Sequence, residues 1–567
     1  MKKQEKMIIY QVLPRIFGND NTTKAANGTI EENGCGKLSA FTDKALKEIK
    51  DMGVTHIWFT GLLEHATQTD YTSYGIRKDY PAIVKGKAGS PYAIKDYYDI
   101  DPDLADNVEN RIKELDELLE RTHKAGMKAI IDFVPNHVAR EYHSDSKPQG
   151  VVDLGEKDDC RTTYAVNNNF YYIPGQAFAP EFLSDSNEKD YQEFPAKVTG
   201  NNCFSAHPNR NDWYETVKLN YGIDFLSGGQ THFHPIPNTW EKMYRILLFW
   251  ASKKVDVFRC DMAEMVPVEF WAWVIPLVKE KHPTITFIAE VYDPSQYRNY
   301  LNVGRFDYLY DKVGLYDTLR RIVRGEQAAH CITGCWQSVD DIQPQMLNFL
   351  ENHDEQRIAS DFFAQDPRKA LPAFVVSATM NNNPFMLYFG QELGERGMEA
   401  EGFSGCDGRT TIFDYWSMDS IRNWRSQGKF TGKLLTEDQK YLRDYYVKIL
   451  QLCNKNKAMQ KGLFYDLMYV NFNRPNFNPD KQYVYMRYYE KELLLIAVNF
   501  DSVDVDTSIF VPAHVFDFFQ IDDAQIGQVK DLLTNTKSNA QVKRNTPCYV
   551  HVKAHDVVIL KVSILPS

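Results

Sequence analysis

The sequence predicts an α/β protein built on a (β/α)8 TIM barrel, with a small domain inserted after the third strand and an antiparallel β domain at the C-terminal end. Three observations support this fold class. Short apolar segments alternate with helical periodicity up to residue 458, residues 138–237 interrupt that alternation once, and strand periodicity alone continues after residue 459. Strands that alternate with helices form parallel sheets, and eight such units close into a barrel.

Eight short segments rich in apolar and β-branched residues are the expected barrel strands. They are residues 8–13, 55–59, 129–134, 255–261, 284–288, 306–310, 346–350 and 385–389. Helices are expected between them, and the first, residues 41–50, is followed by a typical stop signal at Gly53. Further expected helices are a segment with a face of Ile112, Leu115, Leu118 and Leu119, and residues 239–253, 266–282, 315–323, 370–380 and 436–457. A proline, Pro276, is expected to disturb the helix at 266–282.

Three domains follow from this pattern. Residues 1–137 and 238–458 are assigned to the barrel. Residues 138–237 are rich in Asn, Asp, Gly, Pro and Tyr, and because a structureless loop of that length is improbable, we assign them to an inserted domain B. Residues 459–567 are assigned to a C-terminal β-sandwich domain, since residues 483–488 and 493–498 flank Glu490 and Lys491 like a hairpin.

Composition and charge restrict the classes of binding partner and the cellular location that we expect for this protein. The chain has 567 residues and a net charge of −11, which argues against nucleic acid and anionic membranes as partners, because both select basic surfaces. No apolar run reaches the length of a transmembrane helix. The N-terminus lacks a signal-peptide pattern, so we expect a cytoplasmic protein, or a periplasmic or secreted one if a leader has been removed. Nine cysteines without ligand spacing indicate neither a disulfide framework nor a zinc site.

The fourth expected strand ends in charged residues. Arg259 and Asp261 stand two positions apart, so on a strand both side chains point to the same face. A carboxylate beside a permanent cation stays ionised, as a nucleophile requires. Asp261 is therefore the candidate nucleophile, and a purely structural Arg/Asp pair is the alternative.

Further acids stand at the ends of other strands, namely Asp132, Glu290 and Asp354. In this type of barrel the reactive groups come from the C-terminal ends of several strands. Chemistry that needs one ionised and one protonated carboxyl group is that of glycoside hydrolysis. Glu290 ends an apolar strand, where partial desolvation is expected to keep it protonated as the general acid, although a salt-bridged glutamate is the alternative. Asp354 is expected to grip substrate hydroxyls.

Four segments resemble the ordered signature regions of the α-amylase family of glycoside hydrolases. They are residues 132–137 (DFVPNH), 258–261 (FRCD), 288–291 (IAEV) and 349–354 (FLENHD), and their order and spacing also fit the family. The resemblance covers the barrel, the insert and the C-terminal β domain. It implies that the enzyme retains the anomeric configuration and that its two catalytic carboxyl groups lie about 5–5.5 Å apart.

Site roles follow from the resemblance position by position. Asp261 would be the nucleophile, Glu290 the acid/base and Asp354 the stabiliser of the transition state. The resemblance also implies five substrate-binding residues in the cleavage subsite: Arg259, His137, His353, Asp132 and Tyr92. Of these, Arg259 would position Asp261, and Tyr92 would form the stacking floor.

Two departures from the family pattern concern substrate and metal. Glu264 and Met265 stand where many α-amylases carry Lys-His, which argues against an ordinary liquefying amylase. Residues 217–220 (VKLN) resemble the extra signature of members that act on short or cyclic maltodextrins and on pullulan, although a plain strand or turn is an alternative. Asn136 matches a residue that ligates a structural Ca²⁺ in many relatives, but the Lys-His segment that helps to complete that site is missing. Calcium therefore stays open, and no cofactor is expected for the chemistry itself.

The expected function is that of a retaining hydrolase that cleaves α-glucosidic, mainly α-1,4, bonds in starch or maltodextrin-like substrates. A transglycosylase or a neopullulanase- or maltodextrinase-like enzyme of the same family is the first alternative. A non-catalytic carbohydrate-binding protein is the second, which the presence of all three acids disfavours. The expected partner is an oligo- or polysaccharide, and the sequence leaves the oligomeric state open.

Overall fold

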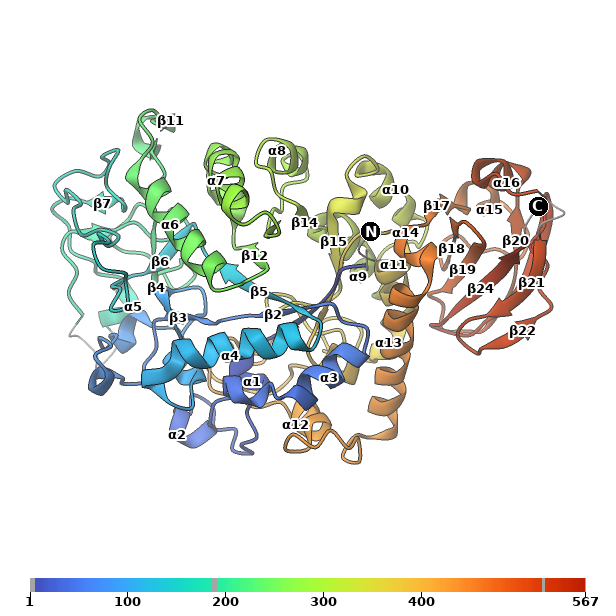
Figure 1. Ribbon diagram of the computed structural model, residues 1–567, viewed down its shortest axis with the longest axis horizontal. Coiled ribbons are helices and arrows are strands. Elements are labelled where there is room, and N and C mark those ends of the chain that lie inside the picture. Colours follow the sequence, from blue (N-terminus) through green and yellow to red (C-terminus); the bar gives the residue numbers. More distant parts are fainter. Residues whose placement is uncertain (1–5, 185–190, 523–525, 566–567) are drawn as a thin grey trace.

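The computed structural model describes residues 6–184, 191–522 and 526–565. Figure 1 shows a barrel in the middle, the inserted segment at one end and the C-terminal β domain at the other. Within the described residues, no helix combines the length and the apolar character that a bilayer-spanning segment needs.

Eight parallel strands close into a barrel, which confirms the predicted fold class. Their order around the barrel follows their order in the sequence, with the last strand pairing with the first. The strands are β1 (Ile8–Val12), β2 (His56–Phe59), β5 (Lys128–Phe133), β12 (Val257–Cys260), β13 (Thr286–Ala289), β14 (Tyr308–Tyr310), β15 (Met346–Phe349) and β16 (Phe385–Tyr388). Each lies within a residue or two of a predicted segment, because short buried strands between polar boundaries give a clear local signal.

Helices surround this barrel (Figure 1). The predicted ones are α3 (Asp43–Asp51), α4 (Arg111–Lys124), α6 (Asn238–Ser252), α7 (Val268–Lys281), α9 (Asp317–Val323), α11 (Leu371–Thr379) and α13 (Glu437–Lys455). The side chain of Thr42 caps α3 by accepting from the Ala45 N–H, which explains where that helix begins. Helix α7 runs continuously through Pro276, so the expected disturbance does not end it. Shorter helices are α1 (Pro14–Phe17), α2 (Ile30–Asn33), α5 (Glu181–Ser184), α8 (Tyr297–Asn302), α10 (Cys331–Ser338) and α12 (Asp419–Arg425).

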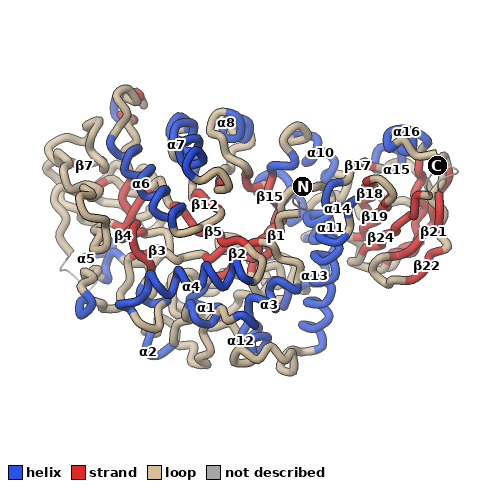
Figure 2. The backbone as a smooth tube through the Cα atoms, viewed as in Figure 1, coloured by secondary structure: helices blue, strands red, loops and turns tan. Residues whose placement is uncertain are grey.

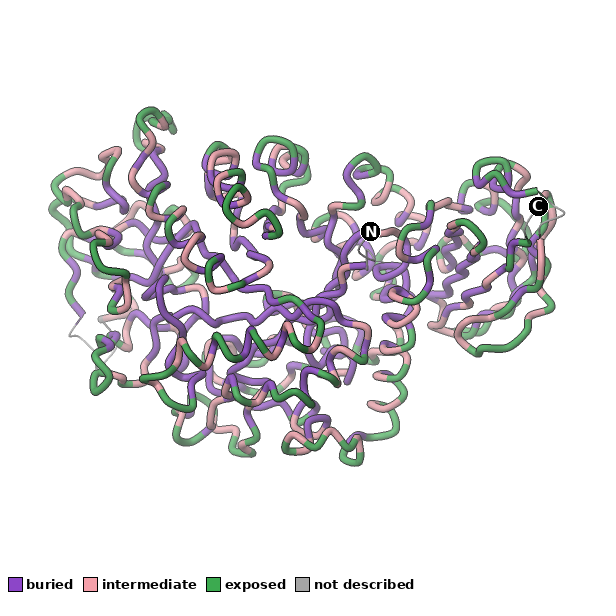
Figure 3. The backbone as a smooth tube through the Cα atoms, in the orientation of Figure 1, coloured by how far each residue is buried: buried purple, intermediate pink, exposed green. Residues whose placement is uncertain are grey.

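The core lies between the barrel and these helices, and buried backbone follows the barrel strands in Figure 3. All residues of β1, β2, β12, β15 and β16 are buried. Trp58, Trp250 and Trp271 are among the largest fully buried side chains. Burial of apolar surface contributes about 25 cal/mol per Å², so aromatic side chains of this size are major contributors to stability.

The insert is mostly loop, as Figure 2 shows. Its regular structure is a set of two-stranded antiparallel pairs: β6 (His137–Ala139) with β9 (Thr216–Lys218), β7 (Tyr172–Ile173) with β8 (Ala196–Lys197), and β10 (Ile223–Asp224) with β11 (Gln230–Thr231). His137 pairs with Lys218 across β6 and β9, which brings the end of the DFVPNH segment beside the VKLN segment. A further pair that the sequence did not predict, β3 (Leu63–His65) with β4 (Ile94–Ile100), precedes the insert.

The C-terminal region is antiparallel, as predicted. A six-stranded sheet has the order β17 (Leu463–Asp466), β18 (Gln482–Tyr489), β19 (Glu492–Asn499), β24 (Val557–Ile564), β21 (Ile526–Asp531) and β22 (Thr536–Ser538), and β20 (Val505–Val511) pairs separately with β23 (Thr546–Val552). The predicted hairpin is present, with Tyr489 opposite Glu492. Helices α14 (Lys457–Lys461), α15 (Met468–Asn471) and α16 (Ala513–Phe519) accompany the strands. Arg487 Nη1 donates to the Thr379 carbonyl at 2.7 Å and so joins the sheet to α11.

Candidate active site

The site is organised around Arg259, the third residue of β12. Strand register places it opposite Asp132 on β5 and opposite Ile288 on β13. Its Nη1 donates to Asp261 Oδ1 at 2.7 Å and to Asp132 Oδ1 at 3.3 Å, while Nη2 lies 2.9 Å from Glu290 Oε2. One guanidinium therefore contacts three of the predicted site carboxylates, and the side chain is only 1% exposed.

Arg259 carries one positive charge and contacts three carboxyl groups, those of Asp132, Asp261 and Glu290. Burial opposes the charge of Arg259, but the Glu290 carboxylate and its neighbours raise the pKa of Arg259 well above its ordinary value. Burial also raises the pKa of Asp261 well above that of an ordinary aspartate, because the loss of hydration and the charges of Glu290 and Asp132 outweigh the attraction of Arg259. Ionisation of Asp261 beside Arg259 therefore stays a prediction, which burial and the neighbouring carboxyl groups oppose.

Glu290 follows the end of β13 and is 2% exposed. Its Oε1 accepts from the Tyr292 hydroxyl at 2.6 Å, and its Oε2 accepts from the Met262 N–H at 2.8 Å. Met262 has a φ of 43°, a left-handed conformation that is uncommon for this residue type. With Arg259, these contacts hold both oxygens of Glu290 in place, and its role as the general acid stays a prediction.

Asp132, Tyr92 and His353 form a second layer of contacts. Asp132 Oδ2 accepts from Trp58 Nε1 at 2.9 Å, and burial raises the pKa of Asp132 to about 6. The Tyr92 hydroxyl donates to Asp132 Oδ1 at 3.4 Å, and its ring stacks on that of His353 with the centroids 5.1 Å apart. The hydroxyl and the ring of Tyr92 thus both have partners, and the residue as a whole is half-buried.

His353 is oriented by Gln11, a residue of β1. Gln11 Nε2 donates to His353 Nδ1 at 2.8 Å, which places the ring proton on Nε2. That nitrogen lies 2.6 Å from the Tyr92 hydroxyl and 3.0 Å from Asp354 Oδ2. Among the three candidate catalytic carboxyl groups, that of Asp354 is the most exposed to solvent. Its side chain is 44% exposed, compared with 8% for Asp261 and 3% for Glu290.

His137 lies where β6 begins, and its ring centroid is 5.3 Å from that of Trp213. Burial and the Lys218 charge lower the pKa of His137 to about 3, so the imidazole is neutral. The His137 imidazole also hydrogen-bonds to the backbone of Tyr92. The structure therefore brings together Asp132, Arg259, Asp261, Glu290, His353, Asp354 and Tyr92, and His137 joins this group through Tyr92 at the border with the insert.

The surroundings of Asn136 do not fit a calcium ion. Asn136 Oδ1 accepts a hydrogen bond from Lys218 Nζ, and Asn136 Nδ2 donates to the Gly200 carbonyl at 2.9 Å. Lys218 Nζ also donates to the Met265 carbonyl at 3.2 Å. Lys218 thus bonds to the two neutral oxygens, one amide and one carbonyl, that this position offers, whereas a hard dication prefers carboxylates.

Four residues that contact the predicted site residues were not themselves predicted: Gln11, Trp58, Tyr292 and Tyr310. Tyr310 accepts from Arg259 Nε at 3.1 Å. All four stand in or just after barrel strands, and that position is the signal that could have found them. Glu264, the departure from the Lys-His pattern, accepts from the N–H groups of Tyr292 and Asp293, both at 3.0 Å, and so holds the segment that follows Glu290.

A closed parallel barrel with four carboxyl groups and one arginine at the C-terminal ends of its strands belongs to the class of barrel enzymes that act through paired acids. Comparison with known proteins gives the family. Residues 11–447 match the family model "Alpha amylase, catalytic domain", so the chain belongs to the α-amylase family of glycoside hydrolases.

Individual relatives are distant. The chain is 25% identical over 400 residues to the alpha-amylase MalA of Haloarcula japonica and 20% identical over 408 residues to neopullulanase 2 of Thermoactinomyces vulgaris. Each match covers 69% of this chain, but only 45% and 57% of the length of those relatives. Among solved structures, the alpha-amylase of Geobacillus thermoleovorans in complex with acarbose is similar over 99% of both chains, with a TM-score of 0.63 at 19% identity.

Proposed function

We propose that this protein is a retaining glycoside hydrolase that cleaves α-1,4-glucosidic bonds in starch or maltodextrin-like substrates. The observation that carries the proposal is the contact of one guanidinium with both Asp261 and Glu290, which makes two carboxyl groups on adjacent strand ends neighbours. A nucleophile and an acid/base that flank the scissile bond, about 5–5.5 Å apart, are what double displacement requires.

In the first step Asp261 attacks the anomeric carbon, and the bond from that carbon to the departing oxygen breaks. Glu290 gives its proton to this oxygen. In the second step Glu290 takes a proton from water, and the resulting hydroxyl group displaces Asp261 from the sugar. The proton balances over one turnover, because Glu290 gives one proton to the departing oxygen and takes one from water.

The other predicted site residues bind and orient the sugar in this proposal. Asp354 is open to solvent, so its carboxylate can accept from substrate hydroxyl groups. The Nε2–H of His353 lies beside it, and the ring of the half-buried Tyr92 can stack on a sugar face. Asp132 stays bound to Trp58 and Arg259, which suits a residue that positions the cation.

A second candidate is a neopullulanase- or maltodextrinase-like activity, or transglycosylation by the same intermediate. Residues 217–220 favour it, because this segment resembles the signature of such enzymes, and one of the relatives above is a neopullulanase. Lys218 of this segment bonds to Asn136, which immediately precedes His137 at the border of the proposed site.

Product analysis tests these proposals. Purified protein is incubated with starch, maltoheptaose and pullulan, and the linkage, length and anomeric form of the products are followed by chromatography and NMR. Short maltodextrins released first as the α-anomer support the retaining α-1,4 hydrolase, cleavage of pullulan supports the second candidate, and products longer than maltoheptaose reveal transglycosylation. If the wild type releases nothing from any substrate, or if an Asp261→Asn variant is as active as the wild type, the proposal is wrong.

A further inference from the structure

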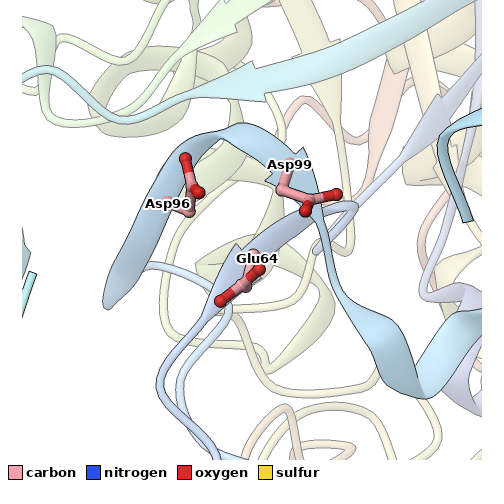
Figure 4. Close-up of side chains that lie close together, drawn as sticks. All are labelled: Glu64, Asp96 and Asp99. Atoms are coloured by element: carbon pink, nitrogen blue, oxygen red, sulfur yellow. The ribbon is translucent and has the colours of Figure 1, made fainter. Parts of the chain in front are cut away.

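Three carboxylates that the proposed reaction does not use lie together on the β3–β4 pair. Glu64 comes from β3, and Asp96 and Asp99 come from β4 (Figure 4). One carboxylate oxygen from each lies within 4.8 Å of the others. The three residues are at most 1% exposed. Acidic side chains are rarely buried so fully unless they are paired, so this cluster needs an explanation.

Asp99 and Asp96 have partners. Asp99 Oδ1 accepts from Arg111 Nε at 2.9 Å, and its Oδ2 accepts from Arg111 Nη2. Asp96 Oδ1 accepts from the Tyr98 N–H at 2.7 Å and from Ser144 Oγ at 2.6 Å, while its Oδ2 accepts from the Ser146 N–H at 3.0 Å. Arg111 is thus the cation bound to this cluster among the described residues.

Glu64 is different, because neither of its carboxylate oxygens has a hydrogen-bond partner among the described residues. The nearby Lys95 does not fill this gap, since its Nζ donates to Asp79 Oδ2 at 2.9 Å and to the Arg77 carbonyl. An unpaired buried carboxylate is costly, so either a proton or a cation must neutralise it.

We propose that Glu64, Asp96 and Asp99 bind a calcium ion. Calcium takes oxygen ligands at about 2.3–2.6 Å, so two ligands of one ion lie at most about 5 Å apart, which agrees with the separation of these oxygens. Oxygen-only ligands exclude the metals that prefer nitrogen or sulfur. Magnesium fits less well, because it usually keeps several waters, and these side chains are closed to solvent.

The position of this ion indicates which parts of the fold it would stabilise. The Ser144 and Ser146 groups that bond to Asp96 belong to the beginning of the insert, and β4 begins two residues after Tyr92. The ion would therefore fix the insert to the β3–β4 pair and stabilise the segment that carries Tyr92. Its role is structural, and it is distinct from the Asn136 position.

Metal analysis of the intact protein tests the proposal. The wild type is stripped with EDTA, dialysed against Ca²⁺ or Mg²⁺, and its metal content and melting temperature are measured. We expect one Ca²⁺ per chain, and a melting temperature several degrees higher with Ca²⁺ than after stripping. Glu64→Gln, which keeps the shape but removes the charge, should retain no Ca²⁺ and show no Ca²⁺-dependent shift. Asp96→Asn should behave in the same way, which covers the case that Glu64→Gln does not fold.

Two matched variants locate the ion. Glu109→Gln changes an exposed glutamate and Asn136→Ala changes the other candidate position, and both should retain one Ca²⁺. The proposal is overturned if the wild type retains no Ca²⁺, or if Glu64→Gln binds as much as the wild type. In either case a proton neutralises Glu64. Loss of Ca²⁺ in Asn136→Ala alone would move the site to the insert border. Because none of these readouts depends on glycoside hydrolysis, they stand or fall independently of the proposed reaction.

Discussion

Arg259 and Asp132 face each other across the β12–β5 pair, with Arg259 Nη1 3.3 Å from Asp132 Oδ1. The same nitrogen lies closer to Asp261, at 2.7 Å, so Asp132 competes for the charge that would keep the candidate nucleophile ionised. We therefore expect the pH dependence of activity to change when one of these charges is removed.

Asp261→Asn and Glu290→Gln should differ in their response to the leaving group. Loss of the nucleophile should abolish turnover of every substrate, because no covalent intermediate can form. Loss of the acid should lower kcat on maltodextrins by about 10²–10⁴-fold, yet much less on an aryl maltoside whose leaving group needs no proton. Steady-state kinetics on both substrates check this. Equal losses on both substrates for Glu290→Gln would contradict the acid/base assignment.

On the acidic side of the pH profile, kcat/KM should fall with an apparent pKa above that of an ordinary aspartate, which is about 3.9. The nucleophile must be ionised, and burial raises the pKa of Asp261, so activity is present above this raised pKa and is lost as the pH falls through it. Asp132→Asn removes a charge that raises the pKa of Asp261 and should therefore lower this apparent pKa. The apparent pKa reports the coupled cluster rather than one residue. An apparent pKa that rises in Asp132→Asn would refute this account.

Much of the fold was predictable because its signals are local. Segments such as β12 and β15 are short buried strands bounded by polar residues, and the acids at their ends mark the active face. The contacts of Gln11 with His353 and of Tyr292 with Glu290 were not predictable, because they depend on side-chain directions that no sequence period encodes. The β3–β4 pair was missed for a related reason, since its register shifts on both sides of Glu64 and hides the alternation of a regular strand.

Arg259→Met should destabilise the protein strongly. It leaves Asp261, Glu290 and Asp132 buried without their cation, and removal of one partner of a buried ion pair costs about 3–5 kcal/mol. Urea denaturation measures the change in the free energy of unfolding. Arg298→Met is the matched control, because the Arg298–Asp341 pair is exposed and should be worth about 0–1 kcal/mol. Similar losses in the two variants would show that Arg259 does not neutralise the cluster.

Lys218→Met should lower the free energy of unfolding by about 1–3 kcal/mol, because the Asn136 and Met265 oxygens lose their buried donor. Added Ca²⁺ should not restore this loss through Asn136, since one amide and one carbonyl oxygen without a carboxylate make a poor site for a hard dication. Denaturation with and without Ca²⁺ measures both effects, with Lys253→Met as a control at a more exposed ion pair. Full recovery with Ca²⁺ would mean that a metal ion can replace the lysine, and that the Asn136 position is a calcium site after all.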